Sequence, residues 1–474
     1  MDNLFHNFLL IMPELGILSI AILVLLVGLF SKSSSSLSLK IGIFLIIILS
    51  CYYYYYFDKI NGDLFSNAYL INHTTYKIKS ILIGLLSLYL FSYLGYFHSI
   101  SKKYNYEYLF ILLIAILGGF IIISSSNFIP LYLGIELTSL CSYVLAAFNR
   151  DDVRSSEAGL KYFTLGSFSS CLMLFGISFM YGISGSLDFK IVNNALQGSP
   201  NIMIICGSVL FLSGILFKLS SVPFHFWTPD VYDGSPILSV TLFSSILKIP
   251  ALFLAIIMAN KVMKPIDYIY VNILQVVTIA SLIIGSIGAV MQKSIKRLMA
   301  YSTILNIGFA LIGVIIGNDA IDKSIIYIII YSISIIGFFT ILYMLIGKEA
   351  ENATIYDLQG LARLKKFGTA GIAFIMFSMI GLPPFAGFFA KYIILYQALT
   401  KKFYLLFVVA IFSALISAYY YLKIVAMLYF NKTKMNDRVM TSKYSLFVSI
   451  ISFIFISFFS LLPIKDLLNY KIFI

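Results

Sequence analysis

The stretch that decides the fold is Phe217–Lys248, FKLSSVPFHFWTPDVYDGSPILSVTLFSSILK. It carries two lysines, one histidine, two aspartates, the only tryptophan of the chain and three prolines, although the flanking segments are almost entirely apolar. An ammonium group at the centre of a bilayer costs at least about 2.5–3.5 kcal/mol. A proline breaks a helix and frees backbone groups that lipid cannot satisfy. Charges beside a broken helix in a membrane therefore predict a pathway for ions.

The composition around this stretch is that of an all-α polytopic membrane protein. Of the 474 residues, 60% are hydrophobic and 11% are charged, and the mean hydropathy is +0.97. A helix needs roughly 20 apolar residues to cross a bilayer, and such runs repeat along nearly the whole chain. We predict about fourteen transmembrane segments, at residues 9–30, 40–57, 77–98, 107–124, 126–148, 157–182, 201–227, 236–259, 266–290, 296–316, 321–346, 366–398, 403–430 and 441–462.

Charge and cysteine content exclude several classes of function. The net charge of +13 requires no nucleic-acid partner, because lysine and arginine are expected in the inner loops of membrane proteins. The loops after odd-numbered segments hold 17 of these basic residues and the opposite loops hold 11, which predicts both termini on the outer face. The four cysteines form no CxxC pair. We therefore expect no metal, iron–sulfur cluster or other cofactor in this chain.

Two segments are too long for a simple crossing. Segments 201–227 and 366–398 have about 27 and 33 residues, or ~40 and ~50 Å of helix against a hydrocarbon core of ~30 Å. The first contains a predicted helix break from Pro223 to Pro229, and the second contains one at Pro383 and Pro384.

The two predicted breaks lie five segments apart, so the second broken helix runs opposite to the first. This pattern predicts two inverted five-helix repeats, 107–260 and 266–430. In this division, three helices precede the repeats (1–106), one helix follows them (431–474), and the whole chain is a single membrane domain.

Five ionisable residues lie deep within the predicted spans, each on a different one: Glu136, Lys161, Lys218, Lys248 and Lys391. Consecutive spans tend to pack side by side, which predicts a polar row along the middle of the membrane. Burial favours the neutral form of a lysine, and a nearby carboxylate favours the charged form. Such a row is able to hold and release protons, so we interpret it as a proton relay.

Structural interpretations exist for some of these residues. Glu136 and Lys161 are alternatively a salt bridge that only stabilises the fold. Lys248 precedes Pro250 and is alternatively a cap for the carbonyl groups of a broken helix. His225 is a candidate proton carrier because histidine changes charge near neutral pH, or else an interior hydrogen-bonding residue.

Three acidic residues are assigned structural positions. Glu14 follows Pro13, and we place it near a membrane interface. Asp230 and Asp233 follow Pro229, and we interpret them as turn residues at the inner surface.

Taken together, the motifs resemble those of a known family, the antiporter-like subunits of respiratory complex I, and within it the N type. The same subunits are similar to those of Mrp-type cation/proton antiporters. The resemblance covers essentially the whole chain and rests on PFHFWTPDVYDGSP (223–236), LGIE (133–136), EAGLKYF (157–163), RLMAYS (297–302) and LPPFAGFFAK (382–391). The Pro-Asp-Val-Tyr form and the lack of a histidine around 243–245 favour the N type.

The resemblance implies a fourteen-helix fold in which each inverted repeat offers half of a proton path. It places the proton-pumping glutamate at Glu136 and the lysines of the path at Lys161, Lys218, Lys248 and Lys391. It also implies that partner subunits bind NADH, FMN, iron–sulfur clusters and quinone. The expected partners are the other membrane and peripheral subunits, above all neighbouring antiporter-like subunits. The expected location is a bacterial inner membrane, or alternatively a mitochondrial one.

Two departures from the family pattern stand out. Asn306 occupies a place where relatives often have histidine, which predicts proton transfer through water at that point. The sequence 235–239 lacks a second proline that is common after the motif, which affects how the next helix begins.

Two other classes of function remain open from the sequence. The chain is alternatively a subunit of a cation/proton antiporter or a membrane-bound hydrogenase, or else a structural spacer in a membrane assembly. A spacer would tolerate loss of every buried charge, whereas a proton path would not.

Overall fold

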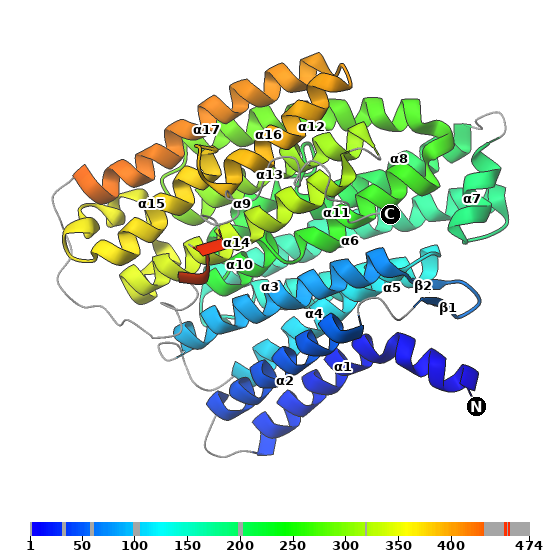
Figure 1. The fold of residues 1–474 in the computed structure, drawn as a ribbon, viewed down its shortest axis with the longest axis horizontal. Coiled ribbons are helices and arrows are strands. Elements are labelled where there is room, and N and C mark those ends of the chain that lie inside the picture. The colour runs from blue at the N-terminus through cyan, green and yellow to red at the C-terminus, as the bar shows by residue number, and fades with distance from the viewer. Residues whose placement is uncertain are drawn as a thin grey trace.

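The computed structural model describes residues 2–30, 35–56, 61–97, 105–197, 202–317, 320–430, 450–452 and 454–455. These residues form a bundle of long, roughly parallel helices (Figure 1). Ten helices in the described ranges are long and apolar enough to cross a membrane. The last predicted segment, 441–462, lies outside the described residues apart from 450–452 and 454–455. The predicted all-α polytopic fold is thus confirmed.

The long helices follow the predicted segments closely, with a few additional short ones. In chain order they are α1 (Asp2–Phe30), α2 (Ser35–Tyr56), α3 (His73–Phe97), α4 (Asn105–Ser124), α5 (Phe128–Ala146), α6 (Val153–Ser184), α7 (Phe189–Leu196), α8 (Ile202–Leu219), α9 (Trp227–Gly234), α10 (Ile237–Ser244), α11 (Lys248–Ile257), α12 (Asp267–Val290), α13 (Ile295–Ile316), α14 (Ile321–Ile346), α15 (Lys366–Ile380), α16 (Ala386–Thr400) and α17 (Tyr404–Phe430).

Both overlong segments are interrupted helices, as predicted. The first consists of α8 and α9, separated by residues 220–226, and Pro223 lies in this gap. The second consists of α15 and α16, separated by residues 381–385, which include Pro383 and Pro384. The prediction for Pro229 is wrong, because it is the third residue of α9. A proline is tolerated in the first turn of a helix, where the backbone N–H has no partner within the helix.

The next segment is also interrupted, which the sequence analysis did not predict. Instead of a continuous helix over 236–259, α10 ends at Ser244 and α11 begins at Lys248. Ser245 has φ −117° and ψ −83°, outside the helical region. A π-helix over Met258–Val262 and a 3-10 turn over Lys264–Ile266 then lead to α12. Two of the gaps in the helical backbone therefore flank the same stretch of chain, α9 and α10.

Short elements cover one end of the bundle. The strands β1 (Gly62–Leu64) and β2 (Tyr69–Ile71) form an antiparallel hairpin. Single bridges join Tyr69 to Ser125, and Asn127 to Asp188 just before α7. Neither the hairpin nor α7 was predicted, because each is shorter than a membrane span.

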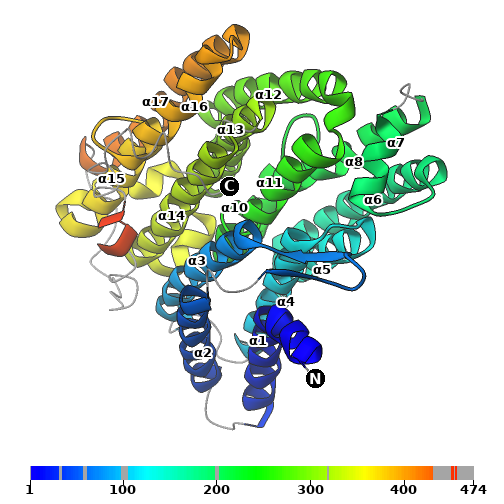
Figure 2. The ribbon, with the colours of Figure 1, turned by 45° about the vertical axis from the view of Figure 1, so that its right-hand side comes forward.

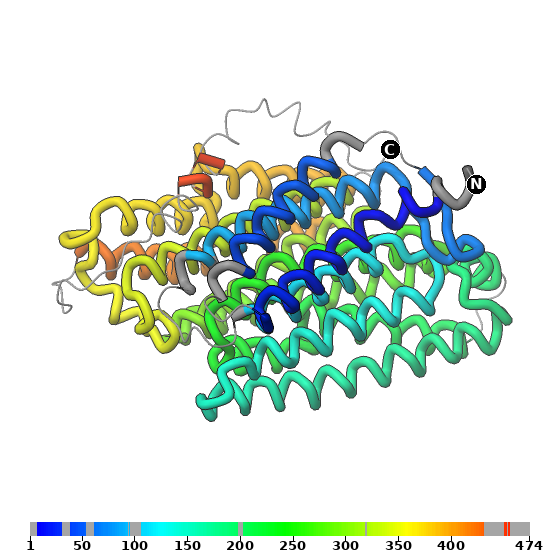
Figure 3. Tube along the Cα trace, turned by 90° about the horizontal axis from the view of Figure 1, so that it is seen from below, coloured from blue at the N-terminus to red at the C-terminus, as the bar shows by residue number. Residues whose placement is uncertain are grey.

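The opposite end, residues 147–152, 235–236, 291–294 and 347–365, belongs to the side whose loops hold 17 of the basic residues, and we call it the basic face for that reason. It contains the 3-10 turns Gly347–Asn352, Ile355–Leu358 and Leu361–Arg363. A bridge between Ser294 and Thr354 ties two of these loops together. In the ribbon, α1 and α2 lie at one side of the bundle and α15 and α17 at the other, with α3, α10 and α14 between them (Figure 2). Seen from below, the dark blue α1 and α2 lie in front of cyan and green helices, and the yellow segments lie at the left (Figure 3).

Close helix contacts depend on glycine at a few positions. A Cβ atom added to Gly176 of α6 would lie 2.5 Å from the carbonyl oxygen of Gly207 on α8. A Cβ at Gly118 of α4 would lie 2.8 Å from the carbonyl oxygen of Gly134 on α5. Small residues let helix backbones approach closely in membranes, where lipid tails offer no hydrophobic driving force. The second contact holds α5, which carries Glu136, against α4.

Candidate functional site

The first broken helix ends at a pair of lysines. Lys218 is the last residue but one of α8, and its Nζ donates a hydrogen bond of 2.5 Å to Ser139 Oγ on α5. Lys248 begins α11, is only 2% exposed, and donates to the Lys218 carbonyl oxygen at 2.9 Å and to Ser220 Oγ at 2.6 Å. The last carbonyl groups of a helix have no partner within the helix. The capping role considered for Lys248 is therefore what the structure shows.

The side chain of Trp227, just after the break, is hydrogen-bonded to α8, the helix before the break. The indole N–H of Trp227, the first residue of α9, donates to the Phe217 carbonyl oxygen at 3.1 Å. Its ring stacks on Tyr162 of α6, with centroids 4.3 Å apart. Lys248 Nζ lies 5.4 Å from the centre of the Trp227 ring, within the range of a cation–π contact. The break thus joins α6, α8, α9 and α11 at one point.

A small cavity of about 40 Å³ lies at this point. Its polar wall consists of Thr138, Ser139, Ser142, Lys218 and Lys248. A polar cavity needs about 10–15 Å³ per water molecule. The two lysines therefore face a space that is large enough for water to carry protons between them.

The second broken helix has a related arrangement. Lys391 of α16 is 6% exposed, and its Nζ donates to the carbonyl oxygens of Met379 at 2.7 Å and Ile380 at 3.1 Å, at the end of α15. The backbone turns at Gly381, whose φ of +91° suits glycine. The ammonium also lies 5.1 Å from the centre of the Phe309 ring on α13. At both sites a lysine from later in the chain caps the helix that ends at the break, from α11 at the first and from α16 at the second.

A cluster of hydroxyl groups surrounds Asn306 beside Lys391. Tyr327 donates to Asn306 Oδ1 at 2.6 Å, and Asn306 Nδ2 donates to the Ser302 carbonyl oxygen at 2.7 Å. Tyr331 donates to Thr303 at 2.8 Å. A cavity of about 20 Å³ touches both Asn306 and Lys391. Proton transfer through water at Asn306 stays a prediction, and this cluster is compatible with it.

Among the described residues, Glu136 and Lys218 form no hydrogen bond or ion pair with each other. Glu136 is half-buried on α5, and its Oε1 has no hydrogen-bond partner in the described part of the chain. Lys218 instead contacts Ser139, one helical turn beyond Glu136. Any coupling between the charges of Glu136 and Lys218 therefore acts through space.

Lys161 differs most from its predicted place. Its side chain is 42% exposed, and Nζ contacts Glu157 Oε1 at 2.8 Å and Asp230 Oδ2 at 3.3 Å. The alternative Glu136–Lys161 salt bridge is wrong, because both partners of Lys161 are other carboxylates. The turn assigned to Asp230 and Asp233 is also wrong, because both residues belong to α9. The reason is that α9 continues seven residues past the predicted end of its segment.

His225 lies in the first break, where it is largely buried. Its Nδ1 is shielded from solvent and has no hydrogen-bond partner within the described ranges. The ring packs against Phe226, with centroids 4.5 Å apart. Its role in proton transfer stays a prediction.

The sequence analysis missed a buried ion pair near the hairpin. Lys79 of α3 contacts Glu14 of α1, and Tyr69 of β2 donates to the same carboxylate oxygen at 2.6 Å. Glu14 is buried beside the hairpin, and its place near a membrane interface stays a prediction. The signal that could have found the pair is that Glu14 and Lys79 each lie inside a predicted apolar segment, 9–30 and 77–98.

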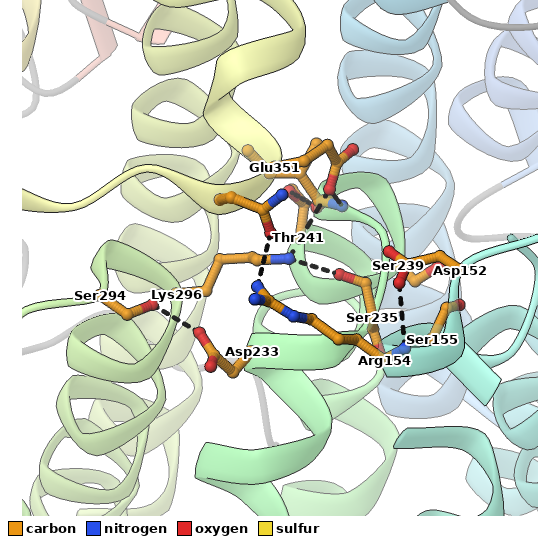
Figure 4. Close-up of polar contacts among 12 residues, drawn as sticks. Asp152, Arg154, Ser155, Asp233, Ser235, Ser239, Thr241, Ser294, Lys296 and Glu351 are labelled. Atoms are coloured by element: carbon orange, nitrogen blue, oxygen red, sulfur yellow. Dashed lines mark hydrogen bonds and ion pairs between the residues drawn. The ribbon is translucent and has the colours of Figure 1, made fainter. Parts of the chain in front are cut away.

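A second cluster lies at the basic face and was also missed. Lys296 of α13 donates to the Ser235 carbonyl oxygen at 2.8 Å and lies 3.6 Å from Glu351 Oε2 (Figure 4). The same carboxylate oxygen accepts the backbone N–H of Ile237 at 3.0 Å. Nearby, Asp233 Oδ1 accepts the Ser294 hydroxyl at 2.5 Å. Residues distant in sequence meet here, so no local motif indicates the cluster.

No group of three or more His, Cys, Asp or Glu side chains in the described residues could hold a metal ion. The expectation that the chain binds no cofactor stays a prediction.

The comparisons with known proteins agree with this geometry. Residues 124–417 match the family described as NADH:quinone oxidoreductase/Mrp antiporter, TM. NADH-quinone oxidoreductase subunit N of Rickettsia felis is 46% identical over 360 residues, which are 75% of this chain and 78% of the relative. This chain belongs to the family of NADH-quinone oxidoreductase N subunits. The predicted family, read from the motifs at 133–136, 157–163, 223–236, 297–302 and 382–391, is confirmed.

Solved structures share the fold of this subunit N family member. A chain of respiratory complex I from Thermus thermophilus superposes with a TM-score of 0.82 at 23% identity, covering 96% of this chain and 98% of that one. A chain of the Mrp complex from Dietzia gives 0.79 at 18% identity, covering 92% and 82%. At these identities the likeness concerns the fold alone. It extends over the N-terminal helices as well as the two broken ones.

Proposed function

We propose that this chain is a proton-translocating membrane-arm subunit of a bacterial NADH:quinone oxidoreductase. The observation that carries the proposal is the position of three lysines at the two helix breaks. Lys218 and Lys248 meet at the first break, and Lys391 caps the second. Buried ionisable groups at broken helices mark ion pathways in membrane proteins. Because this chain belongs to the subunit N family, we take the reaction coupled to proton transfer to be the oxidation of NADH by quinone.

In this proposal the two repeats, 107–260 and 266–430, each carry half of the path. Lys218 and Lys248 exchange protons across the first cavity, and Lys391 exchanges them with the hydroxyl cluster around Asn306. Glu136 acts on Lys218 by its charge. His225 lies in the first break and Lys161 contacts α9 beyond it, and we assign both residues to the entry or exit of the path.

Redox chemistry belongs to other subunits in this proposal. NADH, FMN, iron–sulfur clusters and quinone are bound by partner chains, and this chain receives the energy of quinone reduction as a change in electric field or conformation. Its partners are the other membrane and peripheral subunits and the lipid of a bacterial inner membrane.

The test is to replace Lys218, Lys248 and Lys391 by Met, one at a time, in the intact complex. We expect normal assembly on native gels and at least a several-fold loss of proton pumping in inverted vesicles. Lys190→Met on the exposed side of α7 is the control, because it removes one charge far from either break. A chain that only spaces its neighbours would pump normally in all four variants.

A cation/proton antiporter subunit is the second candidate considered from the sequence. The fold likeness to the Mrp chain is compatible with it, but relatives that share 37–46% identity are named NADH-quinone oxidoreductase subunit N. Co-purification after mild detergent extraction distinguishes the two. Peripheral NADH-oxidising subunits are expected to remain bound to this chain.

A further inference from the structure

The helices α9 and α10 form a short hairpin between the two lysines of the first break. Each helix has eight residues, or roughly 12 Å of length at about 1.5 Å per residue. α9 starts at Trp227, which donates to the Phe217 carbonyl beside Lys218. α10 ends shortly before Lys248. The two open ends of this hairpin therefore meet at the lysine pair, and its apex lies at Ser235–Ile237.

The apex is held by residues of the second repeat. Lys296, the second residue of α13, donates to the Ser235 carbonyl oxygen at 2.8 Å. Glu351, in the 3-10 turn after α14, accepts the N–H of Ile237, the first residue of α10, at 3.0 Å. Lys296 and Glu351 lie 3.6 Å apart, and Figure 4 shows Lys296 extending between Ser235 and Glu351.

Two further contacts attach the α9 arm to the start of α13. Asp233 accepts the hydroxyl group of Ser294, the N-cap of α13, at 2.5 Å. Asp230 accepts from Arg297 Nη1 at 2.8 Å and also contacts Lys161 of α6. The α9–α10 hairpin belongs to the first repeat by sequence, but Ser294, Lys296 and Glu351 of the second repeat bind its apex and the end of α9.

The contacts differ in strength. Lys296 is 5% exposed and Glu351 is 27% exposed, so water screens this pair little. Arg297 and Asp230 are 34% and 40% exposed, and an exposed pair contributes little to stability. Of these two ion pairs, Lys296–Glu351 is therefore the stronger one.

We propose that Lys296 and Glu351 form a positioning pair through which the second repeat sets the geometry of Lys218 and Lys248. A shift of α13 or of the turn after α14 moves the apex, and both arms of the hairpin transmit the movement to the break. The arms end in the Trp227–Phe217 hydrogen bond and the Lys248 contacts, so the distance between the two ammonium groups changes with the apex. The inference rests on the proposed function, because it assigns a consequence for proton transfer.

The test uses the intact complex in inverted vesicles and measures protons pumped per NADH oxidised. Glu351→Gln keeps an acceptor for the Ile237 N–H but removes the charge that holds Lys296. We expect assembly on native gels to be unchanged and the ratio of protons to NADH to fall about two-fold or more. Glu349→Gln is the matched control, because it makes the same change in the same turn on an exposed side chain.

Removing one charge of a buried pair can prevent folding, because the other charge is left buried without a partner. The double variant Lys296→Met/Glu351→Gln removes both charges and is expected to assemble while still pumping poorly. Lys296→Arg keeps the positive charge and the hydrogen-bond donor, so it is expected to keep most of the pumping. A general loss of stability would not predict this difference from the double variant.

A normal ratio in both Glu351→Gln and the double variant would overturn the inference. If Lys218→Met lowers pumping in the same vesicles, the proposed function stands and only the positioning role fails. If Lys218→Met also pumps normally, the proposed function itself fails. NADH oxidation by a soluble electron acceptor measures the peripheral subunits alone and is expected to be equal in all variants.

Discussion

The ammonium group of Lys248 lies 2.9 Å from the backbone carbonyl oxygen of Lys218. One lysine of the first break therefore caps the helix that carries the other. A lysine near a helix C-terminus stabilises the free carbonyl groups and the negative end of the helix dipole. This cap is strongest when Lys248 is charged, so the helix end and the protonation state of Lys248 are linked.

This relationship predicts different outcomes for two replacements of Lys248. Lys248→Met leaves the Lys218 carbonyl and Ser220 hydroxyl without their donor, which costs about 1–3 kcal/mol. We expect a lower melting temperature of the complex and little pumping. Lys248→Arg keeps a charged donor and should preserve the melting temperature while pumping poorly, because arginine does not release its proton. Normal pumping by Lys248→Arg would mean that the residue is only a cap.

Glu136 is predicted to act on Lys218 through space. At about 6 Å and an effective dielectric constant of about 20, a carboxylate stabilises an ammonium group by roughly 3 kcal/mol. Glu136→Gln should leave assembly intact and severely lower both pumping and coupled NADH oxidation. Glu136→Asp should be milder, because the charge is retained.

The corresponding changes at Lys218 separate a carrier from a fixed charge. Lys218→Ala should fail like Glu136→Gln. Lys218→Arg keeps the charge but holds its proton, and it should also pump poorly in inverted vesicles. If Lys218→Arg pumps normally, Lys218 is a fixed counter-charge and the relay is refuted at this position.

The Glu14–Lys79 pair is predicted to support the fold of the N-terminal helices. Lys79→Met leaves Glu14 buried with only Tyr69 as a hydrogen-bond donor, and such an unpaired charge costs about 3–5 kcal/mol. We expect much less assembled complex in the membrane, as measured on native gels. The double variant Glu14→Gln/Lys79→Met should recover assembly. A double variant as defective as the single one would contradict this explanation.

Tyr327 is predicted to stabilise the cluster beside Lys391. Tyr327→Phe removes the donor to Asn306 Oδ1 and leaves a buried acceptor unsatisfied, at a cost of about 1–3 kcal/mol. We expect a lower melting temperature without loss of assembly. Tyr404→Phe is the control, since that side chain is exposed at the start of α17. Equal melting temperatures for the two variants would argue against a buried hydrogen bond at Asn306.

The class of fold, the two broken helices and the family follow from the sequence without the structure. Long apolar runs specify membrane helices because lipid offers no partner for a free backbone group. Glycine and proline at Gly381, Pro383 and Pro384 predict a break from local geometry alone. The lysines at 218, 248 and 391 stand out for the same reason, since a charge within an apolar run is costly.

Only the tertiary structure decided which charges meet. Lys161 contacts Asp230 rather than Glu136, and Lys296 contacts Glu351, because helices distant in sequence come together at the basic face. The break before Lys248 was also hidden, since no proline or glycine lies between Ser244 and Lys248. At this break the ammonium group of Lys248 binds the carbonyl oxygen of Lys218 at the end of α8, and this contact compensates for the interrupted helix. Sequence spacing reports which groups share a helix face, whereas pairing across the bundle depends on how the helices pack.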